Sequence, residues 1–287
     1  DMERVCKKAE EQVEIPVRPC YMYALTREGR KPPMVHVRQS LYSLLEPGKK
    51  KGNVVNLLGF FSPLVDDCEI YDLLHSAGVK TIHEISRCKD YMEYQTMSEA
   101  NFNLVLHHEA RFAAEDFHNR LQIPFIELRR LYQIDKIENQ YHALGNALGV
   151  AFYDEKYKKQ AEDALEKFRQ KCPDASFAIG ECLNADPFEL SLALIRYGFS
   201  VPEIYGTITV ENFTYIRSLE KISPETKVFS NMEPTMIYYD PAKSDVNLAI
   251  GKDACYYHPD CPYVMWNGEE QPYGYAGVRR LFEQLLE

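Results

Sequence analysis

The sequence of 287 residues lacks the short motifs that identify several enzyme classes. It contains no G-x-x-x-x-G-K-[ST] phosphate loop, no G-x-G-x-x-G after a predicted strand and no G-x-S-x-G turn. It also contains no C-x-x-C pair, although eight cysteines are spread along the chain. These absences argue against a P-loop NTPase, a nicotinamide-dependent enzyme, an α/β-hydrolase, a zinc ribbon and a ferredoxin.

Long apolar runs are also absent. No stretch reaches the roughly 18 apolar residues that a membrane-spanning helix requires, so we expect no membrane association. The N-terminal sequence DMERVCKKAEEQ is charged and differs from a secretory signal peptide. The scattered cysteines do not suit a disulfide scaffold in a chain of this length. We therefore expect reduced thiols and a cytoplasmic protein.

Basic residues are fewer than acidic ones. The chain has 33 Lys and Arg residues against 43 Asp and Glu residues, which gives a formal net charge of -10. A diffuse acidic surface repels the phosphate backbone of nucleic acids. The composition therefore predicts that nucleic acid is not a partner.

Apolar segments of strand length alternate with amphipathic helical segments almost throughout the chain. The predicted strands lie at 53–61, 80–86, 101–108, 123–128, 175–181, 203–210, 227–231 and 246–251. Uninterrupted alternation of this kind is typical of parallel sheets that helices cover on both faces. We therefore predict an α/β fold with two Rossmann-like, doubly wound parallel-sheet domains joined by a long charged helix at 154–172.

An incomplete α/β unit precedes these two domains. It consists of a helix, a strand at 15–20, a loop rich in Pro, Gly and basic residues at 26–34, and a helix at 37–47. The predicted domains are thus a partial Rossmann-like domain, a second Rossmann-like domain, and a third one that includes the connecting helix: 1–50, 51–152 and 153–287.

Two strand ends carry residues suited to binding, because ligands of doubly wound sheets lie beyond the carboxyl ends of the strands. His107 and His108 come after residues 101–106 of one strand segment. Either one packs under the next helix while the other faces solvent, or one faces a pocket as ligand, acid or donor. Gly180, Glu181 and Cys182 come after residues 175–179 of another. This is either an ordinary turn or one whose backbone N–H groups attract an anion or a sulfur atom.

The segment CYYHPDCPY at 255–263 has a spacing that suggests metal binding. Cys255, His258 and Cys261 follow the pattern C-x-x-H-x-x-C in a predicted loop at 253–272. Two thiols and one imidazole leave a tetrahedral zinc site one ligand short. The prolines and tyrosines of the same segment favour a packed loop instead. Both interpretations stay open.

Residues 53–86, NVVNLLGFFSPLVDDCEIYDLLHSAGVKTIHEIS, resemble the middle domain of component 1 of nitrogenase and its relatives. The family's V-N-[IL]-[IL]-G strand corresponds to Val55–Gly59. Its D-x-x-E-[IL]-x-x-[LI]-L-x-x-x-G-[VI] segment corresponds to Asp66–Val79. The turn Ile123-Pro124-Phe125 and the C-terminal QPYGYAGVRRLFEQLL also match, with Gln122 in place of a glycine. The similarity is diffuse but covers nearly the whole chain in order, and it enters the family's first domain midway.

The resemblance implies an oxidoreductase subunit with three Rossmann-like domains around an iron–sulfur cluster or related metallocluster. It implies that a separate ATP-dependent iron protein supplies low-potential electrons, and that the chain pairs with itself or with a sister component 1 subunit. A cofactor scaffold or binding protein of the same fold, without turnover, is one alternative. An iron-chelate-type solute-binding protein is another, because such proteins also have Rossmann-like lobes joined by a long helix.

The residues that hold the nitrogenase cofactor are not matched. The family's cysteine falls at Leu106 or His107, its histidine falls within PYGYAG near Tyr273, and its bridging-cluster cysteines would precede residue 1. The resemblance implies that Cys182 and the two histidines face one cleft, beside the loop at 253–272. The candidate cofactor-binding residues are therefore His107, His108, Gly180, Glu181, Cys182 and Tyr273. The candidate metal ligands are Cys182, Cys255, His258 and Cys261.

Overall fold

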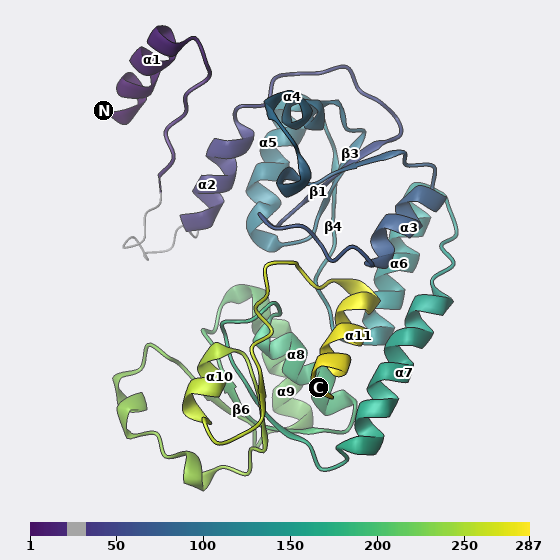
Figure 1. Cartoon of the computed structure of the whole chain (residues 1–287), viewed down its shortest axis with the longest axis vertical. Helices are drawn as coiled ribbons and strands as arrows, with labels where there is room; N and C mark the ends of the chain where they lie inside the picture. Colours follow the sequence, from purple (N-terminus) through teal and green to yellow (C-terminus); the bar gives the residue numbers. More distant parts are fainter. Residues whose placement is uncertain (22–32) are drawn as a thin grey trace. The chain divides into compact units, whose positions relative to one another are not determined.

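The computed structural model describes residues 1–21 and 33–287 (Figure 1). The chain forms two compact units, each with a parallel sheet. The first unit comprises Asp1–Pro63 and Leu74–Arg129, and the second comprises Leu64–Leu73 and Arg130–Glu287. The predicted α/β class with two parallel sheets is confirmed. The division at residues 50 and 152 stays a prediction.

The sheet of the first unit has the strand order β2-β1-β3-β4, with every neighbouring pair parallel. Its strands are β1 (Val54–Leu58), β2 (Thr81–His83), β3 (Phe102–Val105) and β4 (Phe125–Glu127). The helices are α1 (Met2–Val13), α2 (Pro33–Tyr42), α4 (Tyr91–Gln95) and α5 (Arg111–Leu121), and α3 (Glu69–Ser76) spans the boundary between the units. The run VVNLL is buried at every position of β1, as expected for a central parallel strand.

Two asparagines face each other inside this sheet. Asn56 of β1 is in register with Asn103 of β3, and its Nδ2 donates to Asn103 Oδ1 at 2.7 Å and to the carbonyl of Met97 at 2.9 Å. A buried amide is stable only when it is hydrogen-bonded. The asparagine of the V-N-[IL]-[IL]-G strand therefore has a role within the core of the first unit.

The sheet of the second unit has the order β7-β6-β5-β8-β9, again with every pair parallel. Its strands are β5 (Ser176–Ile179), β6 (Ser200–Tyr205), β7 (Lys227–Phe229), β8 (Leu248–Ile250) and β9 (Tyr263–Val264). The helices are α6 (Ile134–Leu148), α7 (Glu155–Lys171), α8 (Pro187–Arg196), α9 (Phe213–Ile222), α10 (Lys252–Tyr257) and α11 (Gly274–Gln284). The chain order reverses between β5 and β8, as in a doubly wound fold.

The long charged helix α7 is part of the second unit rather than a solvated connector. It packs against α11, and its Phe168 ring lies 5.4 Å from Phe199 and 5.5 Å from Phe282. The residues of its apolar stripe are buried, namely Ala161, Ala164, Leu165 and Phe168. The narrow apolar stripe thus holds α7 in the second unit, while most of its charged side chains are exposed.

The incomplete N-terminal unit contains helices but lacks the predicted strand. Residues 15–20 form no strand, since within the described ranges no neighbouring strand pairs with them. Without a neighbouring strand, the backbone N–H and C=O groups of this segment have no ladder of hydrogen bonds that would stabilise an extended strand. The predicted helix at 37–47 is α2, which begins and ends earlier. The predicted loop at 26–34 falls mainly outside the described residues.

Candidate functional site

His107 and His108 lie at the carboxyl end of β3, as predicted, and they differ in environment. His107 is half-buried, and its Nδ1 accepts a hydrogen bond from the backbone N–H of Glu109 at 3.3 Å. Its ring lies 5.7 Å from Phe60 and 4.4 Å from His108, which is exposed. His107 thus fixes the start of the next helical turn, and His108 presents an imidazole at the sheet edge.

A buried arginine fixes the neighbouring loop. Arg38 donates from Nη2 and Nε to the carbonyl oxygen of Gly59, at 2.8 and 3.2 Å, and from Nη1 to Glu109 at 2.6 Å. A Cβ atom at Gly59 would lie 2.9 Å from the backbone nitrogen of His107. The glycine of the V-N-[IL]-[IL]-G strand therefore permits the loops after β1 and β3 to approach each other.

The turn after β5 has its backbone amides occupied. Asp253 of α10 accepts hydrogen bonds from the N–H groups of Glu181 at 2.6 Å and Cys182 at 3.0 Å. The Glu181 carboxylate in turn accepts from the N–H of Thr207, after β6, at 2.9 Å. Burial raises the pKa of the exposed Cys182 thiol, and the charges of Asp253 and Glu181 raise it further. Cys182 is therefore a neutral thiol beside an occupied turn.

His258 lies in a buried polar cluster. Its Nε2 is 2.9 Å from Glu203 Oε2, and the same oxygen accepts from the hydroxyls of Tyr205 at 2.8 Å and Tyr239 at 2.6 Å. Burial alone would raise the pKa of Glu203, but its hydrogen bonds from Tyr239, His258 and Tyr205 outweigh that effect and lower it. The histidine of the C-x-x-H-x-x-C segment thus joins β6, α10 and the segment before β8.

The cysteines that flank His258 have environments typical of packing residues. Cys255 is buried in α10, and burial raises the pKa of its thiol to about 11. The Cys261 thiol donates to the carbonyl of Val246 at 3.5 Å, and burial raises its pKa as well. Within residues 1–21 and 33–287, no three His, Cys, Asp or Glu side chains are grouped to hold a metal ion. Cys255, His258 and Cys261 are therefore not arranged as a preformed metal site.

Tyr273 belongs to a buried structural network formed by the PYGYAG segment. Glu69 accepts hydrogen bonds from the N–H groups of Tyr275 at 2.6 Å and Ala276 at 3.0 Å, and from the Tyr141 hydroxyl at 2.6 Å. Tyr273 is buried in the same region, and its hydroxyl accepts from Gln140 at 3.5 Å. A carboxylate at the first turn of α11 satisfies N–H groups that have no partner within the helix.

The Glu69 network explains two matched motifs at once. Burial raises the pKa of Glu69, although its hydrogen bonds oppose that shift. Gly274 has a φ of 58°, and a Cβ atom there would lie 1.9 Å from Glu69 Oε1. The glutamate of the D-x-x-E-[IL] segment and the glycine of PYGYAG are therefore paired for packing.

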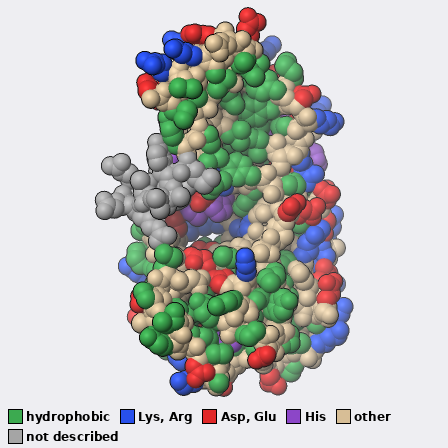
Figure 2. Space-filling model, turned by 60° about the vertical axis from the view of Figure 1, so that its left-hand side comes forward, with side chains coloured by type: hydrophobic (Ala, Val, Ile, Leu, Met, Phe, Trp, Pro, Cys, Tyr) green, Lys and Arg blue, Asp and Glu red, His purple; other side chains and the backbone are tan. Residues whose placement is uncertain are grey.

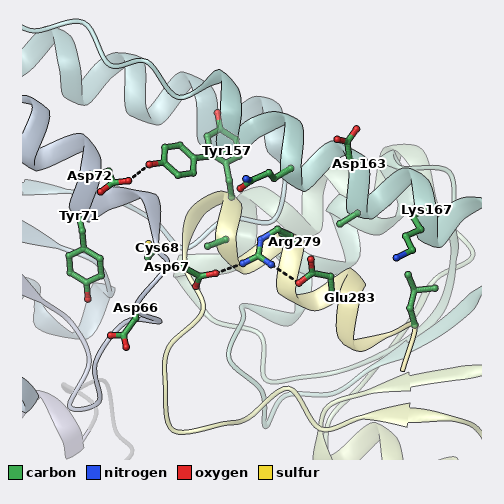
Figure 3. Close-up of a pocket in the computed structure, with 15 residues that line it drawn as sticks. Asp66, Asp67, Cys68, Tyr71, Asp72, Tyr157, Asp163, Lys167, Arg279 and Glu283 are labelled. Atoms are coloured by element: carbon green, nitrogen blue, oxygen red, sulfur yellow. Dashed lines mark hydrogen bonds and ion pairs between the residues drawn. The ribbon is translucent and has the colours of Figure 1, made fainter.

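A cavity of about 670 Å³ lies beside this network, lined by α3, α7 and α11 (Figure 3). Arg279 lies between Asp67 and Glu283 and bonds to both, and Tyr157 donates to Asp72. The carboxylates of the lining outnumber its basic groups, but several are already paired: Asp66, Asp67, Asp72, Asp163 and Glu283 against Lys167 and Arg279. The cavity therefore has an acidic wall in which several side chains are bonded to one another.

Large apolar side chains are exposed on α10 and on the segment before β8 (Figure 2). Ile237, Tyr238 and Tyr256 have exposed fractions of 78%, 80% and 77%. No helix in the described part of the chain has the length and apolar character of a membrane span.

The sequence did not predict several of the hydrogen-bonded pairs described above. Asp253, Glu203 and Glu69 were not predicted as partners of Cys182, His258 and the PYGYAG segment. The matched D-x-x-E-[IL] pattern was the available signal for Glu69. Nothing in the sequence indicated Asp253 or Glu203. The expectation that Cys182 and the two histidines share a cleft joins residues of both units and stays a prediction.

Comparisons with known proteins agree with this fold. A family model described as nitrogenase component 1 type oxidoreductase matches residues 1–287. A solved structure, nitrogenase Cp1 at pH 6.5, is similar with a TM-score of 0.72 and 18% identity, over 100% of this chain and 71% of that one. Nitrogenase Cp1 at pH 5 gives a TM-score of 0.64 and 15% identity, over 100% and 67%. A search of curated proteins finds no match.

Proposed function

Because the chain belongs to the nitrogenase component 1 type oxidoreductase family, we propose that it is a subunit of a nitrogenase-like reductase. In this proposal the assembly accepts low-potential electrons from an ATP-dependent iron protein and reduces a substrate. The family match over the whole chain is the observation that carries the proposal. The two doubly wound sheets support it, because both units have the architecture expected of such a subunit.

The proposal assigns no cluster ligand to the second unit. Asp253 occupies the turn amides beside Cys182, and His258 is paired with Glu203. Cys255 is buried in α10, and the Cys261 thiol donates to the carbonyl of Val246. An iron–sulfur cluster or related metallocluster of the assembly would therefore take its ligands elsewhere. His107 and His108 stay candidates to line its pocket from the first unit.

Partners follow from the same proposal. The exposed apolar side chains of α10 and the segment before β8 favour a contact with a second copy or with a sister subunit. We place the assembly in the cytoplasm, where an ATP-dependent iron protein has its nucleotide. The mass of the anaerobically purified assembly, measured by light scattering, would distinguish a homo-oligomer from a pair of different subunits.

Electron acceptance tests the proposal directly. The full chain, purified anaerobically with its native partner subunit, is mixed with a reduced iron protein and ATP, and oxidation of the iron protein is followed by stopped-flow absorbance. We expect oxidation that requires both ATP and the assembly. An iron protein that reduces its own component 1, but never this assembly, would contradict the proposal.

A cofactor scaffold without turnover is the second candidate. It rests on the same family match over the whole chain, which fits a catalytic subunit and a scaffold of this fold equally well. A scaffold would bind a metallocluster and release it to a recipient protein without accepting electrons. The iron-chelate solute-binding alternative is not supported, because the family match covers the whole chain.

A further inference from the structure

The carboxyl ends of β5 and β8 meet where the strand order of the second sheet reverses. In the sheet, β5 pairs with β6 on one side and with β8 on the other. The chain passes from β5 to β6 and reaches β8 only after β7. In doubly wound sheets such a reversal opens a crevice in which ligands bind. The turn at 180–182 after β5 and the start of α10 after β8 form this part of the second unit.

Two consecutive backbone amides in the turn converge on one anion. The N–H of Glu181 lies 2.6 Å from Asp253 Oδ2, and the N–H of Cys182 lies 3.0 Å from Oδ1. Consecutive N–H groups that point at the same negative charge are the means by which backbone nests bind phosphate and related oxyanions. The turn is therefore organised around a negative charge, which the chain supplies from α10.

The residues around the Asp253 carboxylate leave space for it next to the turn. A Cβ atom at Gly180 would lie 2.3 Å from Asp253 Oδ1, so only glycine leaves room for the carboxylate there. Asn231, in the segment after β7, donates from Nδ2 to Asp253 Oδ2 at 2.8 Å. Gly251, directly after β8, has a φ of 95°, and a Cβ atom there would lie 3.1 Å from Gly180 Cα. Segments that follow β5, β7 and β8 thus converge on one carboxylate.

We propose that Asp253 is an intramolecular latch that occupies an oxyanion-binding site at the carboxyl ends of β5 and β8 and keeps it closed. The amides of Glu181 and Cys182 bind an inorganic oxyanion, such as phosphate or sulfate, when the carboxylate is removed. An anionic ligand of the native protein has to displace Asp253 first. The latch does not depend on the proposed electron transfer, because it involves only the chain's own backbone and one side chain.

The variant Asp253→Ala opens the proposed site. The full chain is labelled with ¹⁵N-cysteine, the Cys182 amide signal is assigned with Cys182→Ser, and phosphate or sulfate is titrated against chloride at constant ionic strength. We expect a saturable shift of the Cys182 signal in Asp253→Ala, with an affinity of about 1 mM. In the unaltered protein the affinity should be at least tenfold weaker, because the carboxylate competes for the same amides.

Two control variants separate the latch from other effects. Asp174→Ala removes an equal charge at the opposite, amino end of β5, where the side chain is exposed, and it should not create anion binding. Asn231→Ala removes a donor to Asp253 but leaves the carboxylate on the amides, so it should behave like the unaltered protein. Asp253→Ser, which shortens the side chain and removes the charge but keeps a polar group near the start of α10, replaces Asp253→Ala if the latter does not fold.

The outcomes are distinct. A saturable Cys182 shift in the Asp253 variants alone supports the latch. Equal binding by the unaltered protein, or binding created by Asp174→Ala, overturns it. A folded Asp253 variant whose Cys182 signal does not respond to either anion also overturns it, because Asp253 would then be only a tether between α10 and the turn. A failure of electron transfer would leave all of these results unchanged.

Discussion

At the residue scale, the polar partners decide what each candidate side chain does. Cys182 was singled out by its position after a strand, and His258 by the C-x-x-H-x-x-C spacing of its segment. Their partners, Asp253 and Glu203, lie far away in the sequence and have no motif of their own. The local sequence predicts which residues follow a strand. It does not predict which side chain from the end of another strand will form a hydrogen bond with them.

The reactivity of Cys182 should depend on Asp253. Burial is the main reason for the raised pKa of this thiol, and the Asp253 carboxylate adds to it. Asp253→Ala should therefore lower the pKa and accelerate alkylation of Cys182 by iodoacetamide at pH 8 by roughly threefold, since the thiolate is the reactive form. Peptide mapping by mass spectrometry measures the rate at this one cysteine. Asp174→Ala serves as the control of equal charge, and an unchanged rate in Asp253→Ala would refute the prediction.

The end of α5 offers a stabilising substitution. Gln122 has a φ of 55°, the left-handed conformation in which glycine is favoured, and its side chain is exposed. Gln122→Gly should raise the free energy of unfolding of the first unit by about 0.5–1 kcal/mol, even though a hydrogen bond to the Asn119 carbonyl is lost. Chemical denaturation followed by circular dichroism measures it. The reverse change at the equivalent position of α6, Gly149→Gln, should destabilise.

At the element scale, the sequence predicted the central part of most strands and of the longest helix. The strands β1 to β8 and the helix α7 lie within or close to the predicted ranges, because an apolar run or a long amphipathic period marks each of them. The helix α10 and the strand β9 were expected to be loop, since six and two residues show no period. The strand predicted at 15–20 has the right composition but no partner strand among the residues that the structure describes. Pairing is a tertiary property that composition does not encode.

At the start of α11, an alanine should be much more destabilising at Gly274 than at Gly277. A Cβ atom at Gly274 would overlap the Glu69 carboxylate and the Tyr141 hydroxyl, at 1.9 and 2.2 Å, in a backbone with φ of 58°. Gly274→Ala should therefore destabilise the second unit by roughly 3 kcal/mol or more.

Gly277→Ala is the matched control one turn later in α11. The nearest atom to a Cβ there would be the Pro272 carbonyl carbon, at 3.3 Å, and alanine favours the helix, so a change within about 1 kcal/mol is expected. Urea unfolding followed by fluorescence compares the two variants. Equal destabilisation by both substitutions would show that the Glu69 network does not constrain the entry of the chain into α11.

At the scale of the whole molecule, the second unit carries its own spectroscopic reporter. Trp266 is the single tryptophan of the sequence, and its indole N–H donates to the Tyr132 hydroxyl at 2.7 Å. Tyr132 donates its backbone N–H to Glu189 at 2.9 Å. The fluorescence of Trp266 therefore follows unfolding in the region around the buried Glu189 carboxylate. Unfolding of the second unit can thus be measured within the full chain.

Glu189 should make the stability of the second unit depend on pH. Burial raises its pKa from 4.5 to about 7, although hydrogen bonds from Gln133 and Tyr132 oppose the shift. A raised pKa means that the folded unit binds this proton more tightly than the unfolded chain does. The contribution of Glu189 is therefore fully present below pH 4.5, decreases as the pH rises to about 7, and is constant above that. The size of the decrease is about 3 kcal/mol.

The variant Glu189→Gln removes this titration and should flatten the pH dependence between pH 5 and 7, whatever its effect on stability at one pH. Glu69, whose pKa is also raised by burial, still titrates in the variant and leaves a residual slope of the same sign. Urea unfolding monitored by Trp266 fluorescence at several pH values gives both slopes. If the unaltered protein and Glu189→Gln have the same slope, Glu189 stays ionised in the folded unit. In that case its hydrogen bonds outweigh the cost of burying its charge.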